Sequence, residues 1–192
     1  IDLRGQDLAR ADFYLPPQDN LVADGSFEGE LTSHWVRSGS TPAVITISAL
    51  SGSGAVLLGK DLVPDPGIPP GTGGNSTIHQ TIAIPVEMTR PILSFMYRLE
   101  TQETSPNDGF EVLIIDQSHN AHYLPQPLYY WQATGWRHQW YDLSAFSGQT
   151  VDLYFNLWQT SLDMRTLVWL DEVSVGSIPT YPYGFIFPVV RK

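Results

Sequence analysis

Short runs of strand-forming residues, each interrupted by proline or glycine, are the feature that most limits the folds open to this chain. Its 192 residues include 15 prolines and 16 glycines. Between them lie runs rich in valine, isoleucine, threonine, tyrosine, phenylalanine and tryptophan, which favour extended backbone. No run places apolar residues at the 3.6-residue period of an amphipathic helix. The pattern therefore predicts an all-β chain.

Turn-forming residues separate the predicted strands. The first five strands are Ala43–Ser48, Gly54–Lys60, Ser76–Pro85, Pro91–Glu100 and Phe110–Asp116. A sixth strand precedes a turn in which we expect Ser144 to cap one helical turn. A seventh begins at Thr150, and the last covers Thr166–Val175. The stretch from Asp61 to Asn75 is so rich in proline and glycine that we expect a surface loop there.

Two predicted strands alternate apolar with polar side chains. In Pro91–Glu100 one face holds Leu93, Phe95, Tyr97 and Leu99. In the strand from Thr150 one face holds Val151, Leu153, Phe155 and Leu157, and the other holds Asp152, Tyr154, Asn156 and Trp158. Because side chains of a strand alternate between its two faces, we expect the first set of each strand to face a core. Many short strands without a crossover helix predict an antiparallel β-sandwich, or jelly roll.

The predicted strands divide the chain into one domain and two ends. We expect an extended N-terminal segment over residues 1–19, a jelly-roll β-sandwich over 20–177 and an apolar C-terminal tail over 178–192. The chain begins at Ile1 without methionine and without a signal-peptide pattern, so we expect a processed, mature form.

Charge and composition exclude several classes of function. The formal net charge is −10, and no basic stripe is present that would bind nucleic acid. No apolar run is long enough for a helix that spans a membrane. The absence of cysteine excludes disulfides and thiolate metal sites.

No catalytic motif points to an enzyme. The sequence contains no HExxH, GxSxG or phosphate-binding glycine motif. His119 and His122 are three residues apart in an expected loop, and no third ligand follows them at the spacing of a metal site. We therefore expect no catalytic activity, although a hydrolase with an unrecognised pair of carboxylates remains a third possibility.

Six stretches, in this order, resemble the jelly-roll carbohydrate-binding modules and MAM-like domains of secreted bacterial proteins. They are "NLVADGSFEG", "SGSGAVLLG", "STIHQTIAIP", "LSFMY", "GWRHQWYDLSAFSGQTVDLYF" and "LDEVSV", which together cover roughly residues 20–177. The resemblance implies a β-sandwich and a secreted or cell-surface location. It also implies a structural calcium ion, held by Glu28 and Asp171 with backbone carbonyls near Ser53. The alternative is that Glu28 serves a turn and Asp171 makes a hydrogen bond at a strand end.

The resemblance also implies sugar binding, which needs flat aromatic faces next to amides or carboxylates. Two places in the sequence offer such groups. The first comprises Tyr154, Asn156 and Trp158, and the second comprises Tyr129, Tyr130 and Trp131. The alternatives are a second apolar layer for the first set and a cluster that covers one end of the sandwich for the second.

Both chain ends carry an aromatic and aliphatic run closed by proline, "ADFYLPP" and "GFIFPVV". Such an end can add a strand either to its own sandwich or to another copy of the protein. The candidate contact residues are Phe13, Tyr14, Tyr183, Phe185, Phe187 and Val189. Our main hypothesis is a non-catalytic extracellular subunit that assembles head-to-tail with copies of itself into a surface filament or sheath. The alternative is a carbohydrate-binding module of a secreted enzyme or adhesin, whose partner is a polysaccharide.

Overall fold

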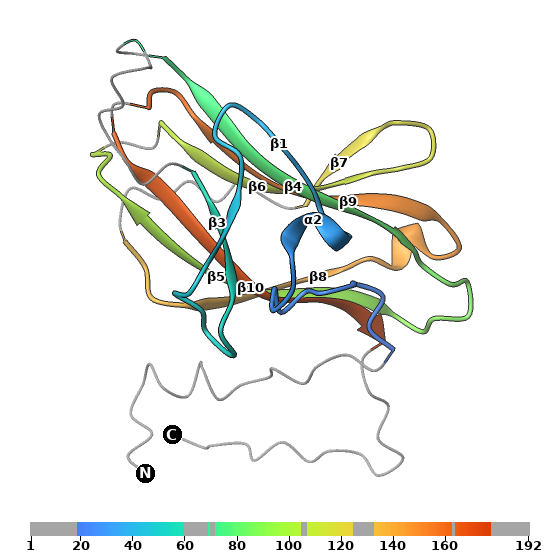
Figure 1. Cartoon of the computed structure of the whole chain (residues 1–192). Helices are drawn as coiled ribbons and strands as arrows, with labels where there is room; N and C mark the ends of the chain where they lie inside the picture. The colour runs from blue at the N-terminus through green and yellow to red at the C-terminus, as the bar shows by residue number, and fades with distance from the viewer. Residues whose placement is uncertain are drawn as a thin grey trace, which may run out of the picture.

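Two antiparallel five-stranded sheets pack face to face in the computed structural model (Figure 1). The structure describes residues 19–59, 69, 72–104, 107–124, 133–162 and 164–177. The predicted all-β sandwich is confirmed. The two terminal segments lie outside the described residues, and the boundaries drawn around the domain stay a prediction.

Each sheet mixes strands from distant parts of the chain. The first has the order β1 (Val36–Ser38), β4 (Gly74–Ala83), β9 (Thr150–Gln159), β6 (Gly109–Ile115) and β7 (Ala121–Tyr123). The second has the order β2 (Val44–Thr46), β3 (Ala55–Leu58), β10 (Thr166–Ser177), β5 (Pro91–Thr101) and β8 (Arg137–Asp142). The described helical segments are short: α2 (Leu31–His34) and the 3₁₀ turn η1 (Ser144–Phe146).

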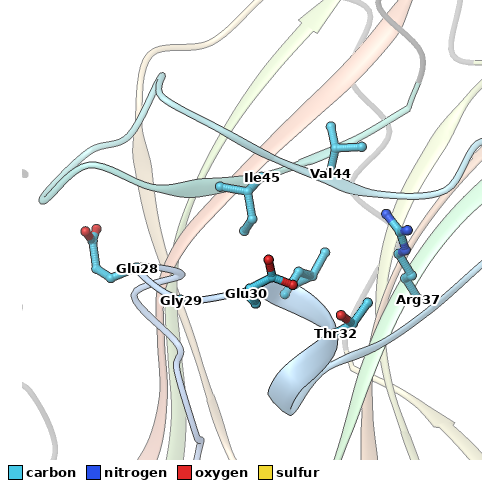
Figure 2. Close-up of a pocket in the computed structure, with 8 residues that line it drawn as sticks. Glu28, Gly29, Glu30, Thr32, Arg37, Val44 and Ile45 are labelled. Carbon is cyan, nitrogen blue, oxygen red and sulfur yellow. The ribbon is translucent and has the colours of Figure 1, made fainter.

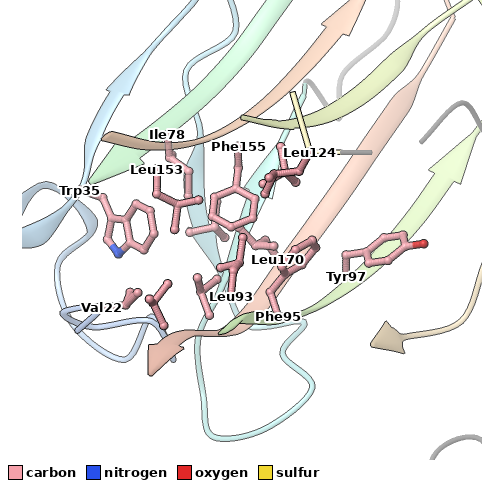
Figure 3. Packing of buried hydrophobic residues seen from close by; sticks show 14 of the residues in the cluster. Val22, Trp35, Ile78, Leu93, Phe95, Tyr97, Leu124, Leu153, Phe155 and Leu170 are labelled. Atoms are coloured by element: carbon pink, nitrogen blue, oxygen red, sulfur yellow. The ribbon is translucent and has the colours of Figure 1, made fainter. Parts of the chain in front are cut away.

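The predicted alternation places the core between the sheets. The residues expected to face inward from β5 and β9 are buried: Leu93, Phe95, Tyr97, Leu99, Val151, Leu153, Phe155 and Leu157. The aromatic members pack edge to face as well as side by side, which fills the space between two sheets efficiently. The ring centroid of Phe155 lies 5.1 Å from that of Phe95 and 6.2 Å from that of Trp35 (Figure 3).

Several local expectations were wrong. Ser144 begins η1 instead of capping it; the capping residue is Leu143, and the backbone N–H of Ser144 donates to the carboxylate of Asp142.

His122 lies in β7 and not in a loop, and its ring is 2.8 Å from the Asp116 carboxylate. The sequence also missed β1 and β7, because three-residue strands with only exposed side chains show no alternation.

The predicted loop that ends at Asn75 was too long. Gly74 and Asn75 belong to β4, where they pair with Gln159 and Trp158 of β9. Glycine carries no side chain that would favour a strand, so only the pairing with β9 reveals the start of β4.

Replacing Phe155 tests the core. Its side chain is fully buried between the sheets, so we expect Phe155→Ala to lower the free energy of unfolding by about 3–5 kcal/mol through lost contacts and a cavity. The matched control is Val86→Ala, because Val86 is 77% exposed and its truncation changes stability by about 0.5 kcal/mol or less. Urea unfolding followed by circular dichroism measures both. Equal effects of the two changes would contradict this placement of the core.

Candidate functional site

The outer face of the first sheet gathers aromatic and polar side chains around β9. Because the odd-numbered residues of β9 point into the core, Tyr154, Asn156 and Trp158 point outward. The three are partly buried, as residues on a shallow platform would be. We call this surface the β9 platform. It consists of the outward-facing residues of β4, β9, β6 and β7, which the pairing of these strands places side by side.

Trp158 lies flat against the neighbouring strand. Its register partner on β6 is Gly109, and an added Cβ at this glycine would lie only 2.6–2.7 Å from three atoms of the indole ring. The indole N–H donates to Oε1 of Glu111 at 2.8 Å. The glycine therefore leaves room for the ring, and the carboxylate fixes its orientation. The sequence had singled out Trp158 but neither Gly109 nor Glu111.

A chain of hydrogen bonds runs across the middle of the platform. The Thr77 hydroxyl donates to Oδ1 of Asn156 at 2.7 Å, and the Asn156 amide donates to Oε2 of Glu111 at 3.4 Å. These contacts link β4, β9 and β6 in one row. The Asn156 amide is thus held in place and shares the Glu111 carboxylate with the indole N–H of Trp158.

A second aromatic group lies further along the platform. The rings of Tyr154 and His79 stack at 4.3 Å with an interplanar angle of 20°. Tyr154 and Trp158 are four residues apart on one strand, a separation of about 13 Å along β9. Burial and then the negative charge of Asp152 raise the pKa of the Tyr154 phenol, which keeps its hydroxyl protonated. Tyr123 of β7 is 62% exposed and faces outward beside Leu113.

The platform is negative. Glu111 and Asp152 face outward, and none of the outward-facing residues of these described strands is lysine or arginine. Chemically the surface therefore offers two separated aromatic groups with fixed amide, hydroxyl and carboxylate groups between them. Such a set can stack against a sugar ring and hydrogen-bond its hydroxyls.

The predicted calcium ligands Glu28 and Asp171 accept hydrogen bonds from opposite ends of one loop, residues 50–54. The Glu28 carboxylate accepts the backbone N–H groups of Ser53 and Gly54 and the Ser53 hydroxyl at 2.6 Å. The Ser53 hydroxyl and backbone bonds, followed by that of Gly54, lower the pKa of Glu28.

Asp171 anchors the other end of this loop. Its Oδ2 accepts the N–H groups of Leu50 and Ser51 at 2.9 and 3.1 Å. Burial raises the pKa of the Asp171 carboxyl, and these backbone bonds oppose the rise. Both carboxylates thus point at hydrogen-bond donors. Among the described residues no three carboxylates or histidines gather as metal ligands. The calcium ion stays a prediction.

Two other predicted sets lie outside the described residues. They are the loop aromatics Tyr129, Tyr130 and Trp131, and the terminal contact residues Phe13, Tyr14, Tyr183, Phe185, Phe187 and Val189. Their roles in sugar binding and assembly remain predictions. In the described part of the chain, no helix is both long and apolar enough to cross a membrane.

Comparison with known proteins identifies the fold. No family model and no curated protein matches the sequence. The structure of the carbohydrate-binding module TmCBM61 in complex with β-1,4-galactotriose is similar, with a TM-score of 0.58 at 13% identity over 83% of this chain and 99% of that one. The second family 16 carbohydrate-binding module gives 0.51 at 15% identity over 81% and 99%.

Part of an enzyme structure shares the fold as well. The enzymatically active domain of tailspike protein 4 from bacteriophage CBA120 gives a TM-score of 0.52 at 16% identity, over 83% of this chain and 21% of that one. At such identities the likeness establishes the fold alone. This chain has the jelly-roll sandwich found in carbohydrate-binding modules, which confirms the resemblance noted in the sequence.

The calcium prediction can be tested by heating the protein with and without a chelator. A calcium ion held by Glu28 and Asp171 would bind only the folded state, so EDTA should lower the melting temperature and excess CaCl₂ should restore it. Differential scanning calorimetry measures the change. The control is Glu28→Gln, in which the response to calcium should weaken. The same melting temperature in EDTA and in CaCl₂ would leave the two carboxylates as anchors of the loop only.

Proposed function

We propose that this chain is a non-catalytic carbohydrate-binding module that holds a polysaccharide on the β9 platform. The observation that carries the proposal is the fixed, flat Trp158 ring over Gly109, with the Asn156 amide and the Glu111 carboxylate beside it. A ring held in advance loses little conformational entropy when a sugar stacks on it. The ordered amide beside it supplies the directional contact that orients the sugar.

The spacing of the aromatic groups favours a chain of sugars over a single sugar. Trp158 and the stacked pair of Tyr154 and His79 are separated by about 13 Å along β9, and Tyr123 widens the platform on the side of β7. A ligand that contacts both ends must therefore be an oligosaccharide. The similar module TmCBM61 was solved with a trisaccharide, which agrees with a ligand of this size.

The charge of the platform favours a neutral polysaccharide. Glu111 and Asp152 face the ligand, and the whole chain carries a net charge of −10. A uronic acid chain would place its carboxylates against these groups, and the outward-facing residues of the described β4, β9, β6 and β7 include no lysine or arginine to pair with them. Neutral sugars can donate hydroxyl hydrogens to the same carboxylates without bringing a negative charge of their own.

The contacts of Glu111 support binding instead of catalysis. A glycosidase needs one protonated and one ionised carboxyl group on opposite sides of the scissile bond. In this structure both oxygens of Glu111 accept hydrogen bonds, from Trp158 and Asn156. Both oxygens are therefore engaged in holding these two neighbouring side chains. We therefore assign Glu111 to positioning the indole, in a module that acts outside the cell or at its surface.

The comparisons favour this carbohydrate-binding alternative over the filament that the terminal segments suggested. The similar folds include carbohydrate-binding modules, whereas the residues expected to mediate assembly lie outside the described structure. Assembly into a filament stays a separate prediction.

Replacing Trp158 tests the platform. We expect Trp158→Ala to weaken binding at least about tenfold, equivalent to about 1.4 kcal/mol, because the stacking surface is lost. The matched control is Trp140→Ala on the second sheet, where Trp140 is 57% exposed but faces away from the platform. Affinity electrophoresis in gels that contain galactan, xylan or mixed-linkage glucan measures the binding. Equal losses in both variants, or no retardation of the wild-type protein on any of these glycans, would contradict the proposal.

Two changes at Glu111 separate its charge from its contact with the indole. Glu111→Gln keeps an oxygen that accepts the Trp158 N–H, so we expect neutral glycan to bind within about threefold of wild type, or about 0.7 kcal/mol. Glu111→Ala removes that acceptor and frees the ring, so we expect a clearly larger loss. Isothermal titration with neutral oligosaccharides and with oligogalacturonate compares them. Only Glu111→Gln should improve the binding of the acidic sugar; tighter wild-type binding to oligogalacturonate than to neutral sugar would be contrary to our assignment.

A further inference from the structure

A groove lies between α2 and β2, on the side of the sandwich away from β7 and β8. It encloses about 480 Å³ and is lined by Glu28, Glu30, Leu31, Arg37, Val44 and Ile45, among others. In Figure 2 Ile45 points from β2 toward Glu30, while Glu28 and Arg37 lie at opposite ends of the groove. The groove shares no lining residue with the β9 platform, so a partner bound in it is independent of the proposed sugar binding.

The chain around this groove exposes an unusual amount of apolar side chain. Of the eight large hydrophobic residues that are exposed in the described part of the chain, five lie between residues 36 and 50: Val36, Val44, Ile45, Ile47 and Leu50. Ile47, just after β2, is 93% exposed. Of these five, Val44 and Ile45 line the groove, whereas Val36 pairs with His79 on the outer face of the first sheet. Exposed apolar side chains in a groove indicate an interaction site.

The edge of β2 is suited to pairing with another strand. Within the described residues β2 is the end strand of its sheet and pairs only with β3. Its three residues are Val44, Ile45 and Thr46, all β-branched and uncharged. Natural edge strands usually carry a charge, a proline or a bulge that prevents pairing, and β2 has none of these within its span.

We propose that the groove between α2 and β2 accepts the C-terminal segment of a second copy, residues 178–192, as an added strand. The segment is rich in apolar residues, with Tyr183, Phe185, Phe187 and Val189 at alternate positions of its sequence. A strand added beside β2 would direct alternate side chains toward the apolar surface of Leu31 and Ile45.

Two of the three prolines of the segment agree with this pairing, and the third, Pro179, is at an odd position close to the start of the segment. Pro182 and Pro188 are both at even positions. In an extended strand their backbone nitrogens therefore face the edge opposite to the one that the main-chain groups of Phe185 and Phe187 face. The main-chain N–H and C=O groups of the odd-numbered residues can then bond to β2. The other edge of the segment, which lacks the N–H groups of Pro182 and Pro188, faces away from β2. That outer edge would resist the addition of a further strand.

Charge also matches between the groove and the segment. Residues 178–192 contain Arg191 and Lys192 and no acidic side chain. The groove presents two carboxylates, Glu28 and Glu30, against one cation, Arg37, on a chain whose net charge is −10. Opposite charges of this kind steer the segment to the groove and weaken repulsion between the two copies.

Length and direction favour a second copy over the same copy. The fifteen residues from Ile178 to Lys192 span up to about 50 Å when extended. Through β3, Val44 and Ile45 of β2 lie level with Trp169 and Leu170 of β10, which come eight and seven residues before β10 ends at Ser177. The segment of the same copy must reverse and run back about 23 Å before it reaches β2. A neighbouring copy can present the whole segment directly.

Because the donor segment and the acceptor groove are different surfaces, the contact is head-to-tail and each copy can make two such contacts. This asymmetry provides the test. A donor variant of the full chain, Phe185→Asp with Phe187→Asp, keeps its groove. An acceptor variant, Val44→Lys with Ile45→Lys, keeps its C-terminal segment. Val86→Lys is the matched control, since Val86 is exposed and lies outside the groove.

Sedimentation velocity measures the mass of each form over a range of concentrations. We expect the wild type and Val86→Lys to grow into longer oligomers as concentration rises, and each double variant alone to remain a monomer. An equimolar mixture of the two double variants should form dimers and nothing larger. Circular dichroism checks that both variants are folded.

Two results would overturn the proposal. One is a wild-type protein that stays monomeric at the highest concentration used. The other is a pair of folded double variants that do not combine when mixed, which would assign the C-terminal segment to its own copy or to no groove at all.

Discussion

The two-residue period of β9 is the constraint on which both the core and the candidate site depend. Its odd residues, such as Phe155, fill the space between the sheets, and its even residues, such as Trp158, form the outer platform. Because a shift of one residue would exchange the two faces, the burial of the apolar set also fixes which side chains face a ligand. The hydrophobic effect that drives folding therefore aligns the proposed binding surface as well.

Neighbours of β9 turn exposed side chains into an ordered surface. On β6, Gly109 provides space and Glu111 an acceptor, so the Trp158 ring is fixed before any ligand arrives. On β4, Thr77 orients the Asn156 amide. Each of these partners is held by a ladder of main-chain hydrogen bonds. A site on paired strands keeps its geometry better than a site on a free loop, and this rigidity suits stacking against a flat sugar face.

The outer face of the first sheet and the β2 margin of the second have different chemistry. The platform is polar, aromatic and negative, whereas the margin at β2 is apolar with only a few charges. Two carboxylates hold the loop that leads into β3. Glu28 connects this loop to the segment before α2, and Asp171 connects it to β10. These anchors place β3 and hence β2 beside α2. The fold can thus present two separate surfaces, one suited to a glycan and one to a strand.

The sequence alone determined the fold class, most strand positions and the inward face of β5 and β9, because alternation and turn residues are local properties of the chain. It also identified Tyr154, Asn156 and Trp158 as a candidate site. It missed Gly109, Glu111 and Thr77, which lie 45 to 79 residues away from their contacts in β9. Only the tertiary structure decided these partners, because the order β4, β9, β6 joins strands that are not consecutive. The exposed edge of β2 is likewise a product of strand order, which no local pattern records.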